Sequence, residues 1–211
     1  MKRLFLIFLI LAALVLIPFA IMGERIEDAM SMENTVKALQ ARGQWAWAVG
    51  IGLLLADLFL PVLGTVVMSA LGLTYGWLLG GIFASLGSIG AGLLAYGLCR
   101  GAGRGIAEKI AGKEGLEQGE RLFSGEAGGW LIALSRWMPV LPEVMACMAG
   151  LTKMPLPKFV VALASGSVPL GFTFAAIGSA GVEKPVLTLL LSACLPPVIW
   201  LLLKPVFFGK K

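Results

Sequence analysis

Long apolar stretches, separated by short polar segments, make up most of this 211-residue chain. A helix needs about 20 largely apolar residues to cross a bilayer. The stretches that approach this length without a charged residue are 4–22, 78–98, 159–177 and 186–203. The pattern therefore predicts transmembrane helices there. The first stretch exceeds a signal-peptide core and lacks a small-residue cleavage pattern, so we expect it to stay uncleaved, with cleavage as the alternative.

Two further apolar stretches are interrupted by proline or glycine. The interruptions are Pro61 and Gly64 in residues 44–77, and Pro139 and Pro142 in residues 130–149. Aromatic residues favour membrane interfaces. Those at the two outer ends of the first stretch are Trp45, Trp47, Tyr75 and Trp77. Both ends are therefore expected at one membrane surface, which predicts a re-entrant helical hairpin.

The polar segments predict surface helices. In residues 23–42, apolar side chains recur at spacings that share one helix face. These are Ile26, Met30, Val36 and Leu39. An amphipathic helix on the membrane surface is expected there, and a surface helix of mixed charge over residues 100–125.

The two interrupted stretches contain near-copies of each other. Residues 61–74 read PVLGTVVMSALGLT, and residues 139–152 read PVLPEVMACMAGLT. We expect the hairpins to be broken at Pro61, Gly64, Pro139, Pro142 and Gly150. In membrane proteins, such paired interruptions in two related halves indicate a transport site.

Lys and Arg set the expected topology, because cytoplasmic loops are enriched in them. With a cytoplasmic N-terminus and each hairpin returning to its own side, the basic residues outside are Arg25, Lys37, Arg42 and Lys184. Arg136 stays in the membrane, and the rest of the 17 lie inside. Both termini are then cytoplasmic, and the two copies enter from opposite faces as an inverted repeat. The net charge of +5 is explained by topology rather than by nucleic acid.

The composition is that of an integral membrane protein. Hydrophobic residues make up 58% of the chain, charged residues 14%, and the mean hydropathy is +0.91. We expect one membrane domain over 1–211: an N-terminal span and amphipathic helix (1–45), a core (46–178) and a C-terminal span (179–211). Without histidine, metal sites and His-based catalysis are not expected, nor is any cofactor. Cys99, Cys147 and Cys194 lie far apart without CxxC spacing and are expected to be buried thiols.

Arg136 is the first candidate for function. It lies between the apolar segments 130–134 and 137–141. An Arg at the bilayer centre costs at least about 3 kcal/mol. Its guanidinium keeps its charge and offers a fork of donors that suits phosphate. We expect Arg136 to bind phosphate; the alternatives are that it reaches the cytoplasmic interface or pairs structurally with Glu143.

Acidic and hydroxyl groups near the interruptions are the other candidates. Asp57 and Glu143 lie in apolar surroundings, where either could bind and release a proton. The alternative is that each is a permanent partner of Arg136 or a helix cap. Thr65 aligns with Glu143 across the repeat, and either residue could contact substrate. Thr65 could instead only cap its helix.

Two further segments are YGLCRGAG at 96–103 and SRWMPVLPEVMACMAGLTKM at 135–154, followed by Phe159. Together they resemble the DedA family, the group with the VTT or SNARE-associated membrane domain. The resemblance covers about 47–178 and implies two opposed re-entrant hairpins and lipid translocation, often tied to the proton gradient. Bacterial members are linked to undecaprenyl phosphate or to phospholipids, and eukaryotic relatives behave as scramblases. Arg136 matches the first Arg of the second hairpin motif, within a frame formed by Pro139, Gly150, Met154 and Phe159.

The chain also departs from the family pattern. The second Arg of many members falls at Pro142, and one acidic position falls at Thr65. Asp57 matches the other acidic position only when shifted by about one residue. Glu143 replaces part of this charge set.

These observations together predict an all-α integral membrane protein with an inverted repeat of two opposed re-entrant hairpins, plus transmembrane and amphipathic surface helices. The expected function is translocation of a phosphate-bearing lipid across the bacterial inner membrane, without enzymatic activity. Anionic lipids are the expected partners, and self-association is left open. The alternatives are a proton- or cation-coupled transporter of small solutes and a non-transporting membrane scaffold.

Overall fold

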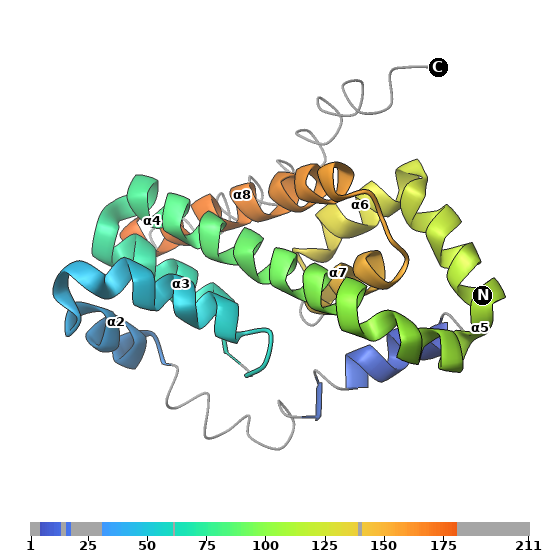
Figure 1. Cartoon of the computed structure of the whole chain (residues 1–211). Coiled ribbons are helices and arrows are strands. Elements are labelled where there is room, and N and C mark those ends of the chain that lie inside the picture. Colours follow the sequence, from blue (N-terminus) through green and yellow to red (C-terminus); the bar gives the residue numbers. More distant parts are fainter. Residues whose placement is uncertain (1–4, 14–15, 18–30, 61, 139–140, 181–211) are drawn as a thin grey trace. The chain divides into compact units, whose positions relative to one another are not determined.

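The computed structural model describes residues 5–13, 16–17, 31–60, 62–138 and 141–180, and every regular element within them is helical (Figure 1). Residues 5–13 and 16–17 are helical. The labelled elements are α2 (Met32–Gln40), η1 (Gly43–Trp45), α3 (Ala46–Ala56), α4 (Gly64–Leu98), the π-helix η2 (Cys99–Gly103), α5 (Arg104–Ser124), α6 (Glu126–Ser135), α7 (Leu141–Leu151) and α8 (Leu156–Ala180).

The described residues form two compact units. The α3 unit comprises residues 31–91 and 167–180, and the α7 unit comprises residues 5–17 and 92–166, apart from the positions that are not described. The long helices α4 and α8 each contribute one part to each unit.

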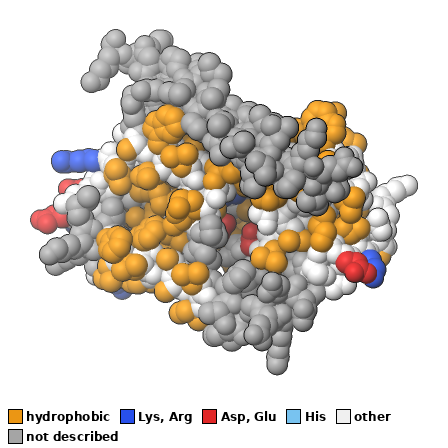
Figure 2. All heavy atoms as spheres, turned by 180° about the vertical axis from the view of Figure 1, so that it is seen from behind, with side chains coloured by type: hydrophobic (Ala, Val, Ile, Leu, Met, Phe, Trp, Pro, Cys, Tyr) orange, Lys and Arg blue, Asp and Glu red, His pale blue; other side chains and the backbone are white. Residues whose placement is uncertain are grey.

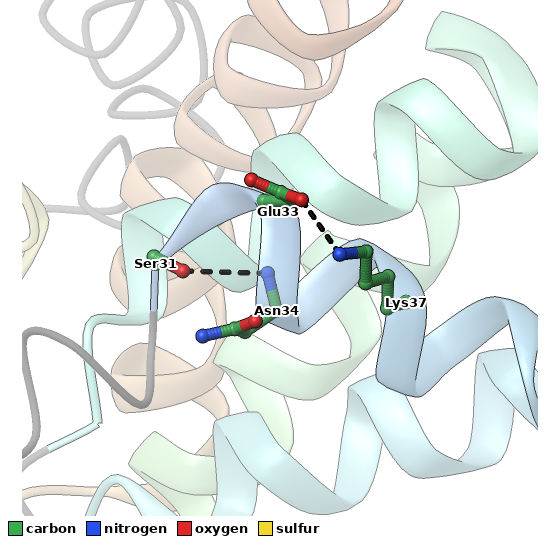
Figure 3. A network of polar contacts seen from close by, with 4 residues as sticks. All are labelled: Ser31, Glu33, Asn34 and Lys37. Atoms are coloured by element: carbon green, nitrogen blue, oxygen red, sulfur yellow. Dashed lines mark hydrogen bonds and ion pairs between the residues drawn. The ribbon is translucent and has the colours of Figure 1, made fainter.

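Helix α2 begins at a side-chain cap. The Ser31 Oγ accepts the Asn34 backbone N–H at 3.3 Å, and the Lys37 ammonium pairs with Glu33 at 2.6 Å (Figure 3). Leu39 is fully buried, whereas Glu33 and Lys37 are exposed. The amphipathic helix predicted within 23–42 is confirmed over Met32–Gln40. Its position on a membrane surface stays a prediction, and residues 23–30 lie outside the described residues.

Helix α4 is two helices joined at Gly76. The Gly76 backbone has φ 77° and ψ 170°, a conformation that glycine adopts without a side-chain clash. The segment 64–75 and α3 form what we call the first helix pair. They pack closely, since a Cβ at Gly50 would lie 2.6 Å from the Leu71 side chain.

The outer ends of the first helix pair are joined to each other. The Trp47 backbone N–H donates to the Tyr75 hydroxyl at 2.9 Å, and the rings of Trp47 and Tyr75 both contact Phe83. The chain therefore turns back on itself within 44–77, as the pattern predicted. Entry of this hairpin into a membrane stays a prediction.

The second helix pair is α6 and α7, joined through residues 136–140. Helix α6 ends in a tight turn, in which the N–H groups of Trp137 and Met138 donate to Leu134 and Ser135. Pro142 lies in the first turn of α7, where a missing N–H costs no helical hydrogen bond. The expected helix breaks at Pro142 and Gly150 were wrong, because both residues lie inside α7. Pro61 and Pro139 lie outside the described residues.

Two pairs of aligned positions in the sequence repeat make similar contacts in the structure. The hydroxyls of Thr74 and Thr152, aligned in the repeat, donate to the carbonyls of Ala70 and Met148, each at 2.8 Å. Gly72 and Gly150 are also aligned, and each meets the backbone of a long helix. A Cβ at Gly72 would lie 2.0 Å from the Ala175 oxygen of α8, and one at Gly150 would lie 2.3 Å from the Tyr96 oxygen of α4. The opposed orientation of the two copies stays a prediction.

Among the described residues, two helices are long and apolar enough to cross a membrane. They cover Gly64–Gly101 and Leu156–Ala180, each with a mean hydropathy of 1.8. They contain the predicted spans 78–98 and 159–177. The predicted span 186–203 lies outside the described residues, and 4–22 is described only in part. Figure 2 shows apolar side chains over much of the described surface on one face, with few charged ones, as suits a membrane protein.

Candidate functional site

Arg136 is buried at the end of α6. Its backbone is the C-cap of that helix, and its side chain is 8% exposed. The stem of the side chain lies against α8 at Gly166, where a Cβ would be 2.8 Å from the Arg136 Cγ and 2.4 Å from the Ala133 oxygen. The absence of a side chain at Gly166 thus creates the space for Arg136.

Glu143 follows Arg136 across the break between the two helices. It is half-buried in the first turn of α7, where a carboxylate complements the positive end of the helix dipole. The two charges are close enough to interact electrostatically. Arg136 ends α6 and Glu143 lies in the first turn of α7, so both charges belong to the α7 unit. Their pairing stays a prediction.

Asp57 occupies a comparable place in the α3 unit. It is the C-cap of α3, and its carboxylate lies over the beginning of α4, since a Cβ at Gly64 would be 2.9 Å from its Oδ2. Both breaks thus place an acidic side chain at the start of the helix that follows. This position suits a helix cap, one of the two roles considered from the sequence.

Thr65 is exposed at the second position of α4, where its carbonyl accepts the Ser69 hydroxyl at 2.9 Å. It belongs to the α3 unit with Asp57, whereas Arg136 and Glu143 belong to the α7 unit. Contact of Thr65 with a substrate stays a prediction.

Residues from the two segments that carry the family resemblance contact each other in an aromatic cluster. The rings of Tyr96 and Phe159 stack with centroids 4.4 Å apart, and the Tyr96 hydroxyl donates to the Met154 carbonyl at 2.6 Å. Arg100 donates to the Tyr96 hydroxyl and, at 3.1 Å, to the same carbonyl. These contacts fasten the turn between α7 and α8 to the end of α4.

A disulfide joins η2 to α7. Cys99 and Cys147 are 48 positions apart in sequence, but their Cα atoms lie 5.1 Å apart. The expectation that both are inert thiols was wrong, because α7 packs against the end of α4 at Gly150 and so brings the two cysteines together. Sequence spacing gave no sign of this packing. Cys194 lies outside the described residues.

Lys158 is a buried cation, whereas the distribution of Lys and Arg predicts it only as a cytoplasmic charge. It is 8% exposed, and its ammonium donates to the carbonyls of Phe123 at 3.3 Å, Ser124 at 2.6 Å and Gly125. The sequence feature that could have indicated a buried Lys is its position directly before the predicted span 159–177. In the described part of the chain, no group of three or more His, Cys, Asp or Glu side chains is placed to hold a metal ion.

Most residues of this site lie within a known protein domain. A family model of the VTT domain matches residues 60–180, more than half of the chain, and this span includes Arg136, Glu143 and Lys158. No curated protein and no solved structure matches the chain. The chain belongs to the family defined by the VTT domain, which is the domain of the membrane-associated DedA proteins.

Proposed function

We propose that this protein translocates a phosphate-bearing lipid across the bacterial inner membrane, with Arg136 binding the phosphate. Undecaprenyl phosphate and phospholipids share the required headgroup chemistry. Both chain termini lie in the cytoplasm in this proposal, and no covalent bond of the lipid is made or broken.

The burial of Arg136 carries the proposal. A guanidinium that is 8% exposed, at the end of an apolar helix, is expensive unless it has anionic partners. Arg presents its donors in a planar fork that matches two phosphate oxygens at once. A lipid phosphate brought to this residue would gain paired hydrogen bonds where water is scarce.

The surface of α6 fits a substrate with apolar tails. Leu131 and Leu134, on the helix that ends at Arg136, are exposed, as is Met138 just after it. In a bilayer these side chains would face lipid. A headgroup could then contact Arg136 inside the protein while its acyl or prenyl chains stay in the hydrocarbon.

Glu143 supplies a mechanism for release. It balances the charge of Arg136 when no lipid is bound, and an arriving phosphate would compete with it for the guanidinium. Once the phosphate has taken its place at the guanidinium, the Glu143 carboxylate would bind a proton. This exchange would couple lipid binding to the proton gradient. Asp57, at the corresponding break of the α3 unit, is the second candidate for this proton.

The test is translocation by purified protein in vesicles that contain a fluorescent phosphate lipid. Membrane-impermeant dithionite bleaches only the outer-leaflet label, so the slow phase reports translocation. We expect R136A to fall to the rate of protein-free vesicles and R136K to keep part of the activity, because an ammonium replaces the fork by a point charge.

The matched control is R121A, which removes an exposed Arg from α5. It should move lipid at the wild-type rate. A wild-type rate for R136A, in protein that inserts and melts normally, would show that Arg136 binds no substrate. Uptake of free inorganic phosphate by the same vesicles would instead favour a small-solute transporter.

A further inference from the structure

The ammonium of Lys158 fastens the beginning of α6 to the beginning of α8. Among its partners are the three consecutive carbonyls of residues 123–125, which we call the junction between α5 and α6. Those of Phe123 and Ser124 end α5, and carbonyls at a helix C-terminus carry partial negative charge and lack helical donors. The Gly125 carbonyl also accepts the Gly128 N–H at 3.2 Å. The buried charge of Lys158 is therefore compensated by the end of α5.

A second contact lies further along the same two helices. At Gly166 of α8, a Cβ would lie 2.4 Å from the Ala133 oxygen of α6. Gly166 follows Lys158 on α8 by as many residues as Ala133 follows Gly125 on α6. This separation corresponds to roughly 12 Å along a helix. The two contacts therefore fix one register between α6 and the first part of α8.

This register determines where Arg136 lies. Arg136 follows Ala133 by three residues, and its Cγ occupies the space left open by Gly166. Each residue of slippage would rotate the α6 side chains by about 100° around the helix axis. The Arg136 side chain would then leave the space at Gly166.

We propose that Lys158 is a positioning residue for Arg136: its ammonium holds the junction on α8 and thereby sets the register that presents the guanidinium to the lipid phosphate. This inference rests on the proposed function. Lys158 itself does not contact the lipid. Its acceptors are backbone carbonyls, so an Arg at this position could replace it, whereas an apolar side chain of similar length could not.

The experiment compares K158M and K158R with K153M in the vesicle assay. Lys153 is exposed five residues earlier and is the matched control. We expect K158M to lower phosphate-lipid translocation by about tenfold to a hundredfold, because small displacements of a binding group have effects of this size. K158R should restore most of the activity, and K153M should behave as wild type.

A distance measurement separates positioning from a general loss of structure. Spin labels at L131C on α6 and L156C on α8, both exposed sites, report the register in a chain that keeps the Cys99–Cys147 disulfide and carries C194S. We expect the distance between them to change in K158M and to return in K158R. If K158M does not insert, G166A provides the second variant, since its Cβ forces α6 away while Lys158 remains. It should change the distance and reduce translocation likewise.

The inference is overturned if K158M keeps wild-type translocation, or if translocation falls in K158M while the distance between the labels stays the same. It is also overturned if K158R restores neither the translocation rate nor the distance between the labels. R136A separates this failure from that of the proposed function. Loss of translocation in R136A with full activity in K158M refutes only the role of Lys158. Full activity in R136A refutes the phosphate site itself.

Discussion

Arg136 and Glu143 lie on opposite sides of one helix break, and their charges interact. A pair of this kind could equally hold α6 to α7 or await an anionic ligand. The two roles differ in whether the sign of the charge at each position matters. In a structural pair, exchanging the two residues preserves the attraction.

The exchange R136E/E143R tests this difference. We expect the double variant to insert but to lose phosphate-lipid translocation, because a carboxylate at position 136 repels phosphate. Translocation in vesicles and the melting temperature in detergent are the measurements. Full translocation by the exchanged protein would identify a scaffold pair.

Gly72 and Gly150 show the repeat at the scale of single residues. Each lies against the backbone of a long helix, with space for a hydrogen atom but not for a methyl group. We expect G72A and G150A each to destabilise the protein by about 1–3 kcal/mol, as overpacking does. The controls G52A and G97A meet no atom within 4 Å and should leave stability unchanged or slightly raised. The melting temperatures of the four variants test this prediction. Equal melting temperatures for G150A and G97A would contradict the close approach of Gly150 to the backbone of α4.

Helix α7 is attached to the end of α4 in two ways. It is joined to the end of α4 by the Cys99–Cys147 disulfide and by the close packing of Gly150. At the other end of the unit, Lys158 and Gly166 join α6 to α8. Both arms of the second helix pair are thus fixed to the long helices.

The disulfide gives a prediction for the stability of this element. C99S should lower the free energy of unfolding by about 2–4 kcal/mol, since the bond closes a long loop of the unfolded chain. Reductant should lower the melting temperature of the wild type but not of C99S. Intact mass under non-reducing conditions checks the bond directly: two free thiols in place of the disulfide would contradict it.

At the scale of the whole molecule, the apolar pattern predicted the helices but not their contacts. Apolar runs without a charged residue predicted α8 and the second part of α4, and Pro and Gly near the centres of two other runs predicted the first and second helix pairs. Arg136 and Glu143 were found because a charge in an apolar run is unusual. The roles of Lys158, Cys99 and Cys147 depend on packing between segments distant in sequence, which periodicity does not encode.

The predicted inverted topology can be tested by labelling from one side of the membrane. Arg42 and Lys153 are both exposed and are expected on opposite faces. A membrane-impermeant maleimide added to spheroplasts should label R42C at once and K153C only after permeabilisation. Labelling of both from the same side would rule out opposed hairpins.

The central claim is that Arg136 recognises a lipid through its phosphate. The most direct measurement is the ratio of translocation rates for a fluorescent phosphate lipid and its phosphate-free analogue, in the wild type and in R136A. We predict a large ratio in the wild type that falls to the protein-free value in R136A. An equal ratio in the two proteins would contradict the account.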